Sequence, residues 1–367
     1  MTTQATRIPL FDPGASLRPL RERLEQRMLE VLESGRFVLG PQVKAFEHEL
    51  AGYLGVKHVV GVGNGTDAIT IALKAMDIGS GDEVIVPSFT FYASAEAIVP
   101  TGATPVFCDI DLETYNMTAE TVGQALTSKT KAVLAVDLFG NPARILEIEA
   151  LGVPVLEDAA QAAGSLLDGR KAGSLGHAAT FSFYPSKNLG AFGDAGAIAT
   201  DDDGLADTIR SLRSHGSRDK VTFEKLGFNT RLDELQAGLL RVLLPELDGW
   251  CDGRRRAARM YEDAGAGDLV RLPRAAEGAD PAWHLYVVRR ERADELVETL
   301  NGAGIESRAY YRTPVHRQEP MRTFARDVEL PATEEAARTN FALPIHPTLE
   351  QSQVAHVVET LRAALEG

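Results

Sequence analysis

The sequence is poor in cysteine and has no long apolar run. Its 367 residues include only two cysteines, Cys108 and Cys251, too few for a disulfide framework and without the C-x-x-C spacing of a zinc site. No segment approaches the run of about 18 apolar residues that a membrane-spanning helix needs. The first residues also lack the apolar core of a signal peptide. We therefore expect a soluble cytoplasmic protein that does not contact a membrane.

Positive charge is also scarce, with 38 Lys and Arg against 52 Asp and Glu, which gives a net charge of −14. Such an acidic chain is a poor partner for nucleic acid, and we expect none. His215, His284 and His316 do not show the spacing of metal ligands, so we also expect no metal site.

What the chain does contain is a regular alternation of short apolar runs and helical stretches. This alternation is typical of βαβ units, and it predicts an α/β fold with a large, mostly parallel sheet. We expect strands at 59–62, 84–86, 105–108, 132–136, 153–157, 179–184 and 195–200. We expect helices at 16–34, 42–54, 66–76, 93–99, 118–126 and 143–150.

The pattern changes after about residue 205. Helices are expected at 233–243, 247–261, 293–302 and 350–365, with a strand at 284–289. We therefore predict a large domain over 1–245, including an N-terminal helical segment, and a smaller α+β domain over 246–367, which suits the length. Trp250 and Trp283 are expected to be packing residues, and the arginines at 254–256 to lie on a solvated helix face.

Two candidate chemical groups follow expected strands. Asp158 stands at the carboxyl end of a strand, where open α/β sheets bind their ligands; a helix N-cap is the alternative role. Lys187 follows another strand and lies between Pro185 and several glycines. Burial there would lower its pKa and favour the neutral amine that forms a Schiff base, although a surface turn remains open.

A third candidate is the glycine-rich turn at 61–68, between a strand and a helix. Backbone N–H groups at a helix N-terminus bind phosphate. The third glycine of a dinucleotide fingerprint would fall at Thr66, and no P-loop Gly-Lys-Ser/Thr follows. The turn thus argues against a nicotinamide-dependent oxidoreductase, which the fold class alone would permit.

The three candidates together match one cofactor. Pyridoxal 5'-phosphate needs an acidic residue for its pyridine nitrogen, a lysine for its aldehyde and a site for its phosphate. An aromatic residue after the strand at 84–86, Phe89 or Phe91, would stack on the ring; packing in the core is the alternative for each.

The sequence resembles the DegT/DnrJ/EryC1/StrS family of pyridoxal-phosphate-dependent nucleotide-sugar aminotransferases, over nearly its whole length. The resemblance implies the type I aspartate aminotransferase fold. The segments that carry it are GTDA at 65–68, EDAAQ at 157–161, SFYPSKNLG at 182–190 and GFNTRLDELQA at 227–237, between SGRFVLGP at 34–41 and LPIHP at 343–347.

The resemblance implies a role for each matching residue. Lys187 would hold the cofactor aldehyde and shuttle a proton, and Asp158 would keep the pyridine nitrogen protonated. Gln161 would hydrogen-bond the phenolic oxygen of the cofactor. The phosphate and ring contacts would come from Gly65, Thr66, Ser182 and Phe91, and from Asn229, which would reach the cofactor of a neighbouring subunit.

The family relationship also implies a homodimer with its active site at the interface. Glutamate would convert the cofactor to pyridoxamine 5'-phosphate, which would then aminate a keto group, expected at C-3, of a dTDP- or UDP-linked sugar. Arg231, Tyr310, Tyr311 and His316 would contact substrate, although an interface salt bridge is the alternative for Arg231.

Some family features leave the substrate open. Lys187 argues against the branch that carries histidine there and acts as dehydratases. Ala163 replaces a bulkier residue of many relatives, and Tyr310-Tyr311 replaces a frequent His-Tyr pair. Amination at C-4 and a cofactor-bound regulator without turnover remain the alternatives.

Overall fold

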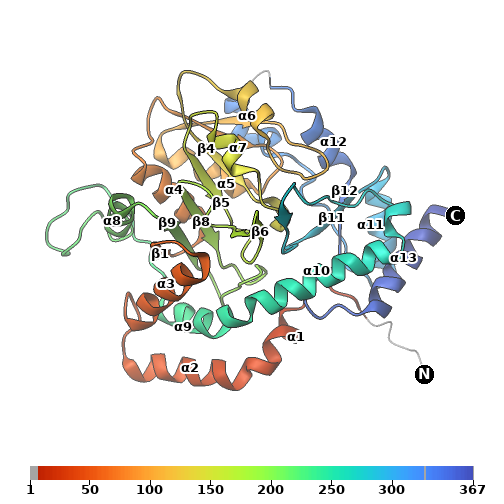
Figure 1. Cartoon of the computed structure of the whole chain (residues 1–367), viewed down its shortest axis with the longest axis horizontal. Helices are drawn as coiled ribbons and strands as arrows, with labels where there is room; N and C mark the ends of the chain where they lie inside the picture. The colour runs from red at the N-terminus through yellow and green to blue at the C-terminus, as the bar shows by residue number, and fades with distance from the viewer. Residues whose placement is uncertain (1–6, 326–327, 367) are drawn as a thin grey trace.

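The computed structural model describes residues 7–325 and 328–366 and is built around a seven-stranded sheet (Figure 1). Its strands are β1 (His58–Val62), β2 (Glu83–Pro87), β3 (Thr104–Cys108), β4 (Thr130–Val136), β5 (Val155–Asp158), β8 (Ala178–Ser182) and β9 (Gly196–Thr200). Their order is β1-β9-β8-β5-β4-β2-β3. Only β9 runs opposite to the other six strands, so the predicted mostly parallel sheet is confirmed.

Helices cover both faces of this sheet. They are α1 (Pro13–Leu17), α2 (Arg21–Ser34), α3 (Pro41–Leu54), α4 (Gly65–Ala75), α5 (Tyr92–Glu96), α6 (Ala119–Ala125), α7 (Ile145–Glu149), α8 (Asp203–Leu212), α9 (Glu234–Leu243), α10 (Leu247–Asp263), α11 (Ala293–Gly302), α12 (Pro331–Thr339) and α13 (Gln351–Glu366). One apolar cluster joins the sheet to α3 and α9, and another joins it to α4 and α8.

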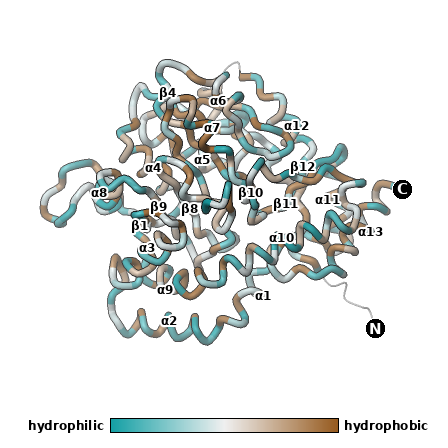
Figure 2. The backbone as a smooth tube through the Cα atoms, in the orientation of Figure 1, coloured by the Kyte–Doolittle hydropathy of each residue, from teal (hydrophilic) through white to brown (hydrophobic). Residues whose placement is uncertain are grey.

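The central strands are apolar on both faces. Val84, Ile85 and Val86 of β2 are completely buried. A strand covered by helices on both sides forms a continuous apolar run instead of an alternating one. Figure 2 shows these hydrophobic stretches gathered in the middle of the molecule, with hydrophilic residues along α2 and α10.

Local signals explain where the first helices end. Gly35 and Gly55, with φ of 63° and 75°, close α2 and α3 in the left-handed conformation that glycine adopts without strain. The helix expected over 16–34 is broken into α1, a 3-10 turn at Arg18–Leu20 and α2. Pro19 lies in that turn and has no N–H to continue the helix.

The C-terminal region forms a smaller layer of its own. Strand β11 (Tyr286–Arg289) pairs antiparallel with β12 (Asn340–Leu343), and an apolar cluster packs them against α10, α11 and α13. The N-terminal Ile8 also joins this cluster. The expected division at residue 245 falls in the 3-10 turn Leu244–Glu246 between α9 and α10, and it stays a prediction.

Several short elements did not appear in the sequence pattern. They are α8, α12, β12 and a small sheet of β6 (Leu166–Leu167), β7 (Arg170–Lys171) and β10 (Ala279–Asp280). The strands among them are two to four residues long, too short to show a period. Within residues 7–325 and 328–366, none of the helices combines the length and apolar character required to cross a bilayer.

Candidate active site

Asp158 is the last residue of β5 and is buried, with 3% of its surface exposed. Its carboxylate accepts hydrogen bonds from Ser94 Oγ at 2.8 Å and from the backbone N–H of Ala160 at 3.2 Å. Burial raises the pKa of Asp158, while these two donors and the charge of Lys187 oppose that rise. The site thus holds a carboxyl group next to a cation at the end of a central strand.

Lys187 lies in the loop that follows β8. Its backbone N–H donates to Tyr184 O at 2.8 Å, which closes a turn. Gly190 fits this turn closely, since a Cβ there would lie 2.6 Å from Pro185 O. Burial lowers the pKa of Lys187 to about 8, and the Asp158 carboxylate acts in the opposite direction. The neutral amine is therefore accessible near physiological pH.

The turn between β1 and α4, where the sequence predicts a phosphate site, meets the end of β8. Asn64 caps α4 by accepting from the N–H of Asp67 at 2.8 Å. Gly65 approaches Ser182 so closely that a Cβ on Gly65 would lie 2.7 Å from Ser182 Cβ. Thr66 follows in the first turn of α4, where N–H groups and the helix dipole attract an anion.

Gln161 and Tyr311 come together beside this site. Gln161 Oε1 accepts from the N–H of Phe139 at 2.8 Å, and its Nε2 donates to the hydroxyl of Tyr311 at 3.2 Å. The Phe91 ring lies 6.0 Å from the Tyr311 ring and is 54% exposed, so it presents a free aromatic face. Phe89, in contrast, is completely buried, which leaves Phe91 for stacking.

The other expected substrate contacts lie in different surroundings. Tyr310 is partly buried, with the Arg308 guanidinium 5.1 Å from its ring centre. His316 is buried and lies between Ser88 Oγ, 2.5 Å from Nδ1, and Glu334, 2.9 Å from Nε2. The substrate-binding roles of these two residues stay predictions.

Asn229 and Arg231 belong to the long connection between α8 and α9. Asn229 is exposed and pairs with Ser214 through an isolated bridge, and Arg231 is partly exposed. Figure 1 shows this connection as a green loop that projects past α8. It carries apolar side chains in water, with Leu226 96% exposed.

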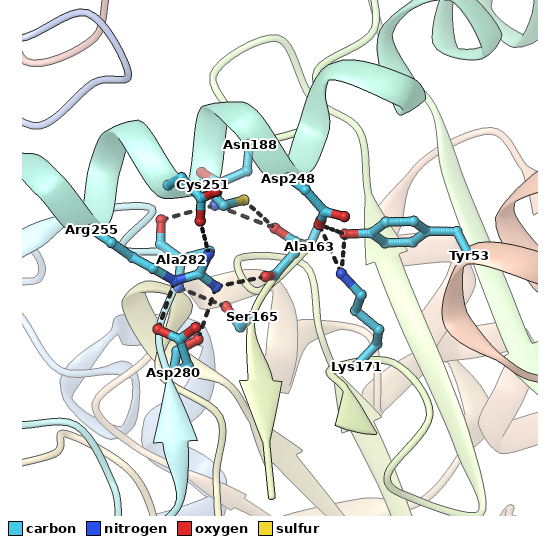
Figure 3. Close-up of polar contacts among 12 residues, drawn as sticks. Tyr53, Ala163, Ser165, Lys171, Asn188, Asp248, Cys251, Arg255, Asp280 and Ala282 are labelled. Atoms are coloured by element: carbon cyan, nitrogen blue, oxygen red, sulfur yellow. Dashed lines mark hydrogen bonds and ion pairs between the residues drawn. The ribbon is translucent and has the colours of Figure 1, made fainter. Parts of the chain in front are cut away.

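Figure 3 shows how Asn188, Cys251 and Arg255 reach the segment around Ala163, in the turn that follows β5. Asn188 Nδ2 donates to Ala163 O at 3.4 Å and to Ala282 O at 3.3 Å. Arg255 Nη2 donates to Gly164 O at 3.0 Å. Gly164 has a φ of 89°, and a Cβ there would lie 2.3 Å from Cys251 Sγ. The turn that follows Asp158 and the loop that carries Lys187 are therefore held in fixed positions relative to each other.

The expectation for the arginines at 254–256 is wrong for Arg254. Only 6% of Arg254 is exposed, and its Nη1 donates to the carbonyls of Trp283, His284 and Ile345 at 3.1–3.3 Å. A run of charges along a helix does not show which residue faces inward, because that depends on the segments packed against it.

Two further groups near Asp158 were not anticipated. Ser94 has no sequence pattern that marks it as a partner of Asp158. Glu157 does have one, since it is an acidic residue inside an apolar strand. It is completely buried and accepts from the N–H groups of Gly173 at 2.5 Å and Leu175 at 2.9 Å.

The residues present fit pyridoxal phosphate. Lys187 and Asp158 supply the amine and the buried carboxyl group that it needs. The space between Gly65 and Ser182 suits its phosphate, because any side chain at position 65 would fill that space. For a metal the described part of the chain offers no group of three or more His, Cys, Asp or Glu residues.

Comparison with known proteins agrees with the resemblance seen in the sequence. A family model for the DegT/DnrJ/EryC1/StrS aminotransferase family matches residues 19–362. The chain is 42% identical to the UDP-N-acetyl-3-dehydro-alpha-D-glucosamine 3-aminotransferase of Acidithiobacillus ferrooxidans, covering 100% of both chains. It is 43% identical to a pleiotropic regulatory protein of Geobacillus stearothermophilus, covering 96% of this chain and 97% of that one.

Among solved structures, the fold is similar to that of S. venezuelae DesV in complex with a ketimine intermediate. The TM-score is 0.94 at 43% identity, over 98% of this chain and 99% of that chain. The large sheet and the C-terminal layer thus follow an architecture already known from enzyme structures.

Proposed function

The chain belongs to the DegT/DnrJ/EryC1/StrS aminotransferase family, and on this basis we propose that it is a pyridoxal-phosphate-dependent transaminase. It moves an amino group from glutamate to the C-3 keto group of a dTDP- or UDP-linked sugar, in amino-sugar biosynthesis. The observation that carries this proposal is Lys187, whose pKa burial lowers to about 8, beside the buried Asp158.

The residues of the site divide the work between binding and proton transfer. Bound pyridoxal phosphate supplies an electron sink for the carbon that gains or loses the amino group. Asp158 holds a proton on the pyridine nitrogen by pairing with it, and Ser94 orients that carboxylate. Lys187 Nζ carries a proton to and from the reacting carbon, which requires an amine that is neutral for part of the time.

The remaining cofactor contacts position the ring. Gly65, Thr66 and Ser182 bind the phosphate, and Phe91 stacks on the ring through its exposed face. Gln161, whose side-chain oxygen accepts from the N–H of Phe139, would hydrogen-bond the phenolic oxygen of the cofactor.

Amination at C-3 is supported by the name of the Acidithiobacillus relative, a 3-aminotransferase. The name of the Streptomyces venezuelae relative, a transaminase for a dTDP-3-amino sugar, agrees. In this proposal Tyr310 and Tyr311 contact the sugar, and Arg231 contacts a diphosphate or carboxylate. His316 acts only through Ser88 and Glu334, which engage both of its ring nitrogens. Amination at C-4 is the alternative within the family.

We further propose that the enzyme is a cytoplasmic homodimer. Its two cysteines are free thiols, the usual state in a reducing compartment. The exposed apolar side chains of the α8–α9 connection suit a subunit contact, which would bring Asn229 to the cofactor of the partner.

An absorbance experiment tests the function directly. The protein with added pyridoxal phosphate should show a band near the visible edge that disappears when glutamate is added and returns with the keto sugar. Lys187→Ala should abolish the band. Absence of the band in the native protein, or its survival in the variant, would contradict the proposal.

The same experiment separates the second candidate, a regulator that binds the cofactor without turnover. The Geobacillus relative is named a regulatory protein, which is the observation that favours it. A stable band that glutamate and keto sugar leave unchanged would support this role instead.

A further inference from the structure

Two carboxyl groups that the proposed reaction does not use lie buried next to Asp158. Asp137 directly follows β4, Glu157 belongs to β5, and both residues are completely buried. The two strands are parallel neighbours, and the carboxyl groups of Asp137 and Glu157 lie within hydrogen-bond reach of each other. Side chains alternate along a strand, so Glu157 and Asp158 point to opposite faces of the sheet.

The hydrogen bonds around this acid pair are shared unequally. Glu157 accepts from three backbone N–H groups, which are those of Gly173 at 2.5 Å, Leu175 at 2.9 Å and Gly176 at 3.3 Å. Asp137 accepts only one, from the N–H of Ala143 to Oδ1 at 2.8 Å. Its buried Oδ2 has no hydrogen-bond donor among the described residues. A buried carboxylate oxygen without a donor is unfavourable, whereas a protonated one becomes a donor itself.

The surroundings supply no positive charge to the acid pair. Among the described residues, no cationic side chain binds either carboxyl group. The cations of the adjacent segments are engaged elsewhere: Arg144 with Glu147 and Asp168, Arg170 with Ser174 O, Lys171 with Asp248, and the exposed His177 near Glu149. Besides Glu157, the charged group that acts on Asp137 is Asp158, and it is also negative.

One proton between the two groups resolves this conflict. Two carboxylates buried in contact would both be desolvated and would repel each other. Burial raises the pKa of Asp137, and Glu157 raises it further through its charge and its hydrogen bond. Burial also raises the pKa of Glu157, but the hydrogen bond with Asp137 and the backbone N–H groups oppose that rise. Asp137 is therefore the group that keeps the proton.

The acid pair is also connected to the site of the cofactor. The N–H of Asp137 donates to Asp158 O at 3.1 Å. Two residues after Asp137, the N–H of Phe139 donates to Gln161 Oε1 at 2.8 Å. Phe139 has a φ of 59°, a conformation that a residue other than glycine keeps only when its surroundings enforce it.

We propose that Asp137 is a positioning residue that keeps a proton on Oδ2 and donates it to Glu157. The acid pair then holds the turn after β4 in the place where Phe139 binds Gln161. The proton is a property of the folded chain and goes beyond the proposed function. The effect on the cofactor rests on that function, and it reaches the cofactor only through Phe139 and Gln161.

Infrared spectroscopy of the cofactor-loaded protein tests the proton directly. At pH 7 exposed carboxyl groups are ionised, because their pKa values are about 4. The difference spectrum between the native protein and Asp137→Asn should show the carbonyl stretch of a carboxylic acid in the native protein alone. Glu157→Gln should keep that band, since Asp137 stays buried without a cation. A difference spectrum without the band, or its loss in Glu157→Gln, would overturn the assignment.

The pH dependence of urea unfolding is a second test. An unfolded aspartate ionises near about pH 4, whereas folded Asp137 keeps its proton to a higher pH. Between these limits the unfolded chain binds one proton fewer, so native stability falls as the pH rises. The unfolding constant of the native protein should therefore rise about tenfold per pH unit relative to that of Asp137→Asn, from about pH 5 up to the folded pKa of Asp137.

An exposed aspartate provides the matched control for unfolding. Asp263→Asn, at the end of α10, should follow the native protein at every pH. Parallel pH curves for the native protein and Asp137→Asn would contradict the buried proton.

The absorbance of bound pyridoxal phosphate reports the positioning role. Asp137→Asn replaces the acid O–H by an amide N–H, so it should keep the native spectrum and the native rate of the glutamate half-reaction. Asp137→Ala leaves Glu157 without this donor, so it should shift the band and lower the rate about ten- to a hundredfold, the usual effect of a misplaced group.

The outcomes separate the proton, its role and the proposed function. A native spectrum and rate in Asp137→Ala would overturn the positioning role. If glutamate leaves the cofactor absorbance of the native protein unchanged, the proposed function fails, and the infrared and unfolding experiments still decide whether Asp137 carries the proton.

Discussion

At the scale of single residues, the chemistry depends on how burial changes two titratable groups of opposite sign. Asp158 ends β5 and Lys187 follows β8, so the two meet at the carboxyl ends of neighbouring inner strands. Each is unfavourable as an isolated buried charge, and each partly compensates the other. The pair is therefore ready to receive a ring that places a positive nitrogen near the carboxylate.

The lowered pKa of Lys187, about 8, predicts how the protein captures its cofactor. The neutral amine attacks the aldehyde, so the capture rate should rise with pH and level off above about pH 8, well below the pKa of about 10.4 of a free lysine. The measurement is the growth of the absorbance band after pyridoxal phosphate is added to cofactor-free protein between pH 6 and 10.

Two variants check that assignment. Asp158→Asn removes the charge that raises the pKa of Lys187, so the midpoint should move to lower pH. Lys187→Ala should abolish capture. A midpoint near pH 10 in the native protein would show that Lys187 is solvated.

At the scale of elements, the site depends on how closely α10 packs against the turn after β5. Gly164 combines a φ of 89° with contact to Cys251 of α10, and Arg255 of the same helix binds its carbonyl. Helix α10 thus packs against the turn that follows Asp158 at Gly164, a position where a side chain does not fit.

Gly164→Ala should therefore destabilise the protein by about 2–5 kcal/mol, the combined cost of a left-handed alanine and of overpacking. Urea unfolding measures the change. Gly152→Ala is the matched control, since Gly152 has a φ of 84° but no atom within 4 Å of its added Cβ. Equal losses in the two variants would mean that the contact with α10 contributes nothing.

At the scale of the whole molecule, the α8–α9 connection carries the most exposed of the large apolar side chains among the described residues. Val221, Phe223 and Leu226 are 79%, 62% and 96% exposed. They belong to this connection, which extends past α8 in Figure 1. Apolar groups gathered in this way favour association.

Leu226→Asp should shift a dimer toward monomer, because a charge placed in an apolar contact must be desolvated. Sedimentation velocity over a concentration series measures this shift. Leu146→Asp, at an exposed leucine of α7, should leave the assembly unchanged. An assembly that is insensitive to Leu226→Asp would place the subunit contact elsewhere.

The sequence by itself determined how strands and helices of the large sheet succeed one another along the chain. It also determined the glycine ends of α2 and α3 and the roles proposed for Lys187 and Asp158. These are local properties: apolar runs mark buried strands, glycine permits a left-handed end, and motif residues are contiguous. Helices α8 and α12 were not predicted, although both are amphipathic and bury one face.

Only the tertiary structure decided which polar residues are buried and what they contact. Arg254 is part of a charged run, yet three carbonyls from distant segments surround it. Ser94 meets Asp158 across 64 residues, and Asn188 joins the lysine loop to Ala163 and Ala282. The physical reason is that burial and hydrogen bonding are set by segments far apart in the chain, which local periodicity does not describe.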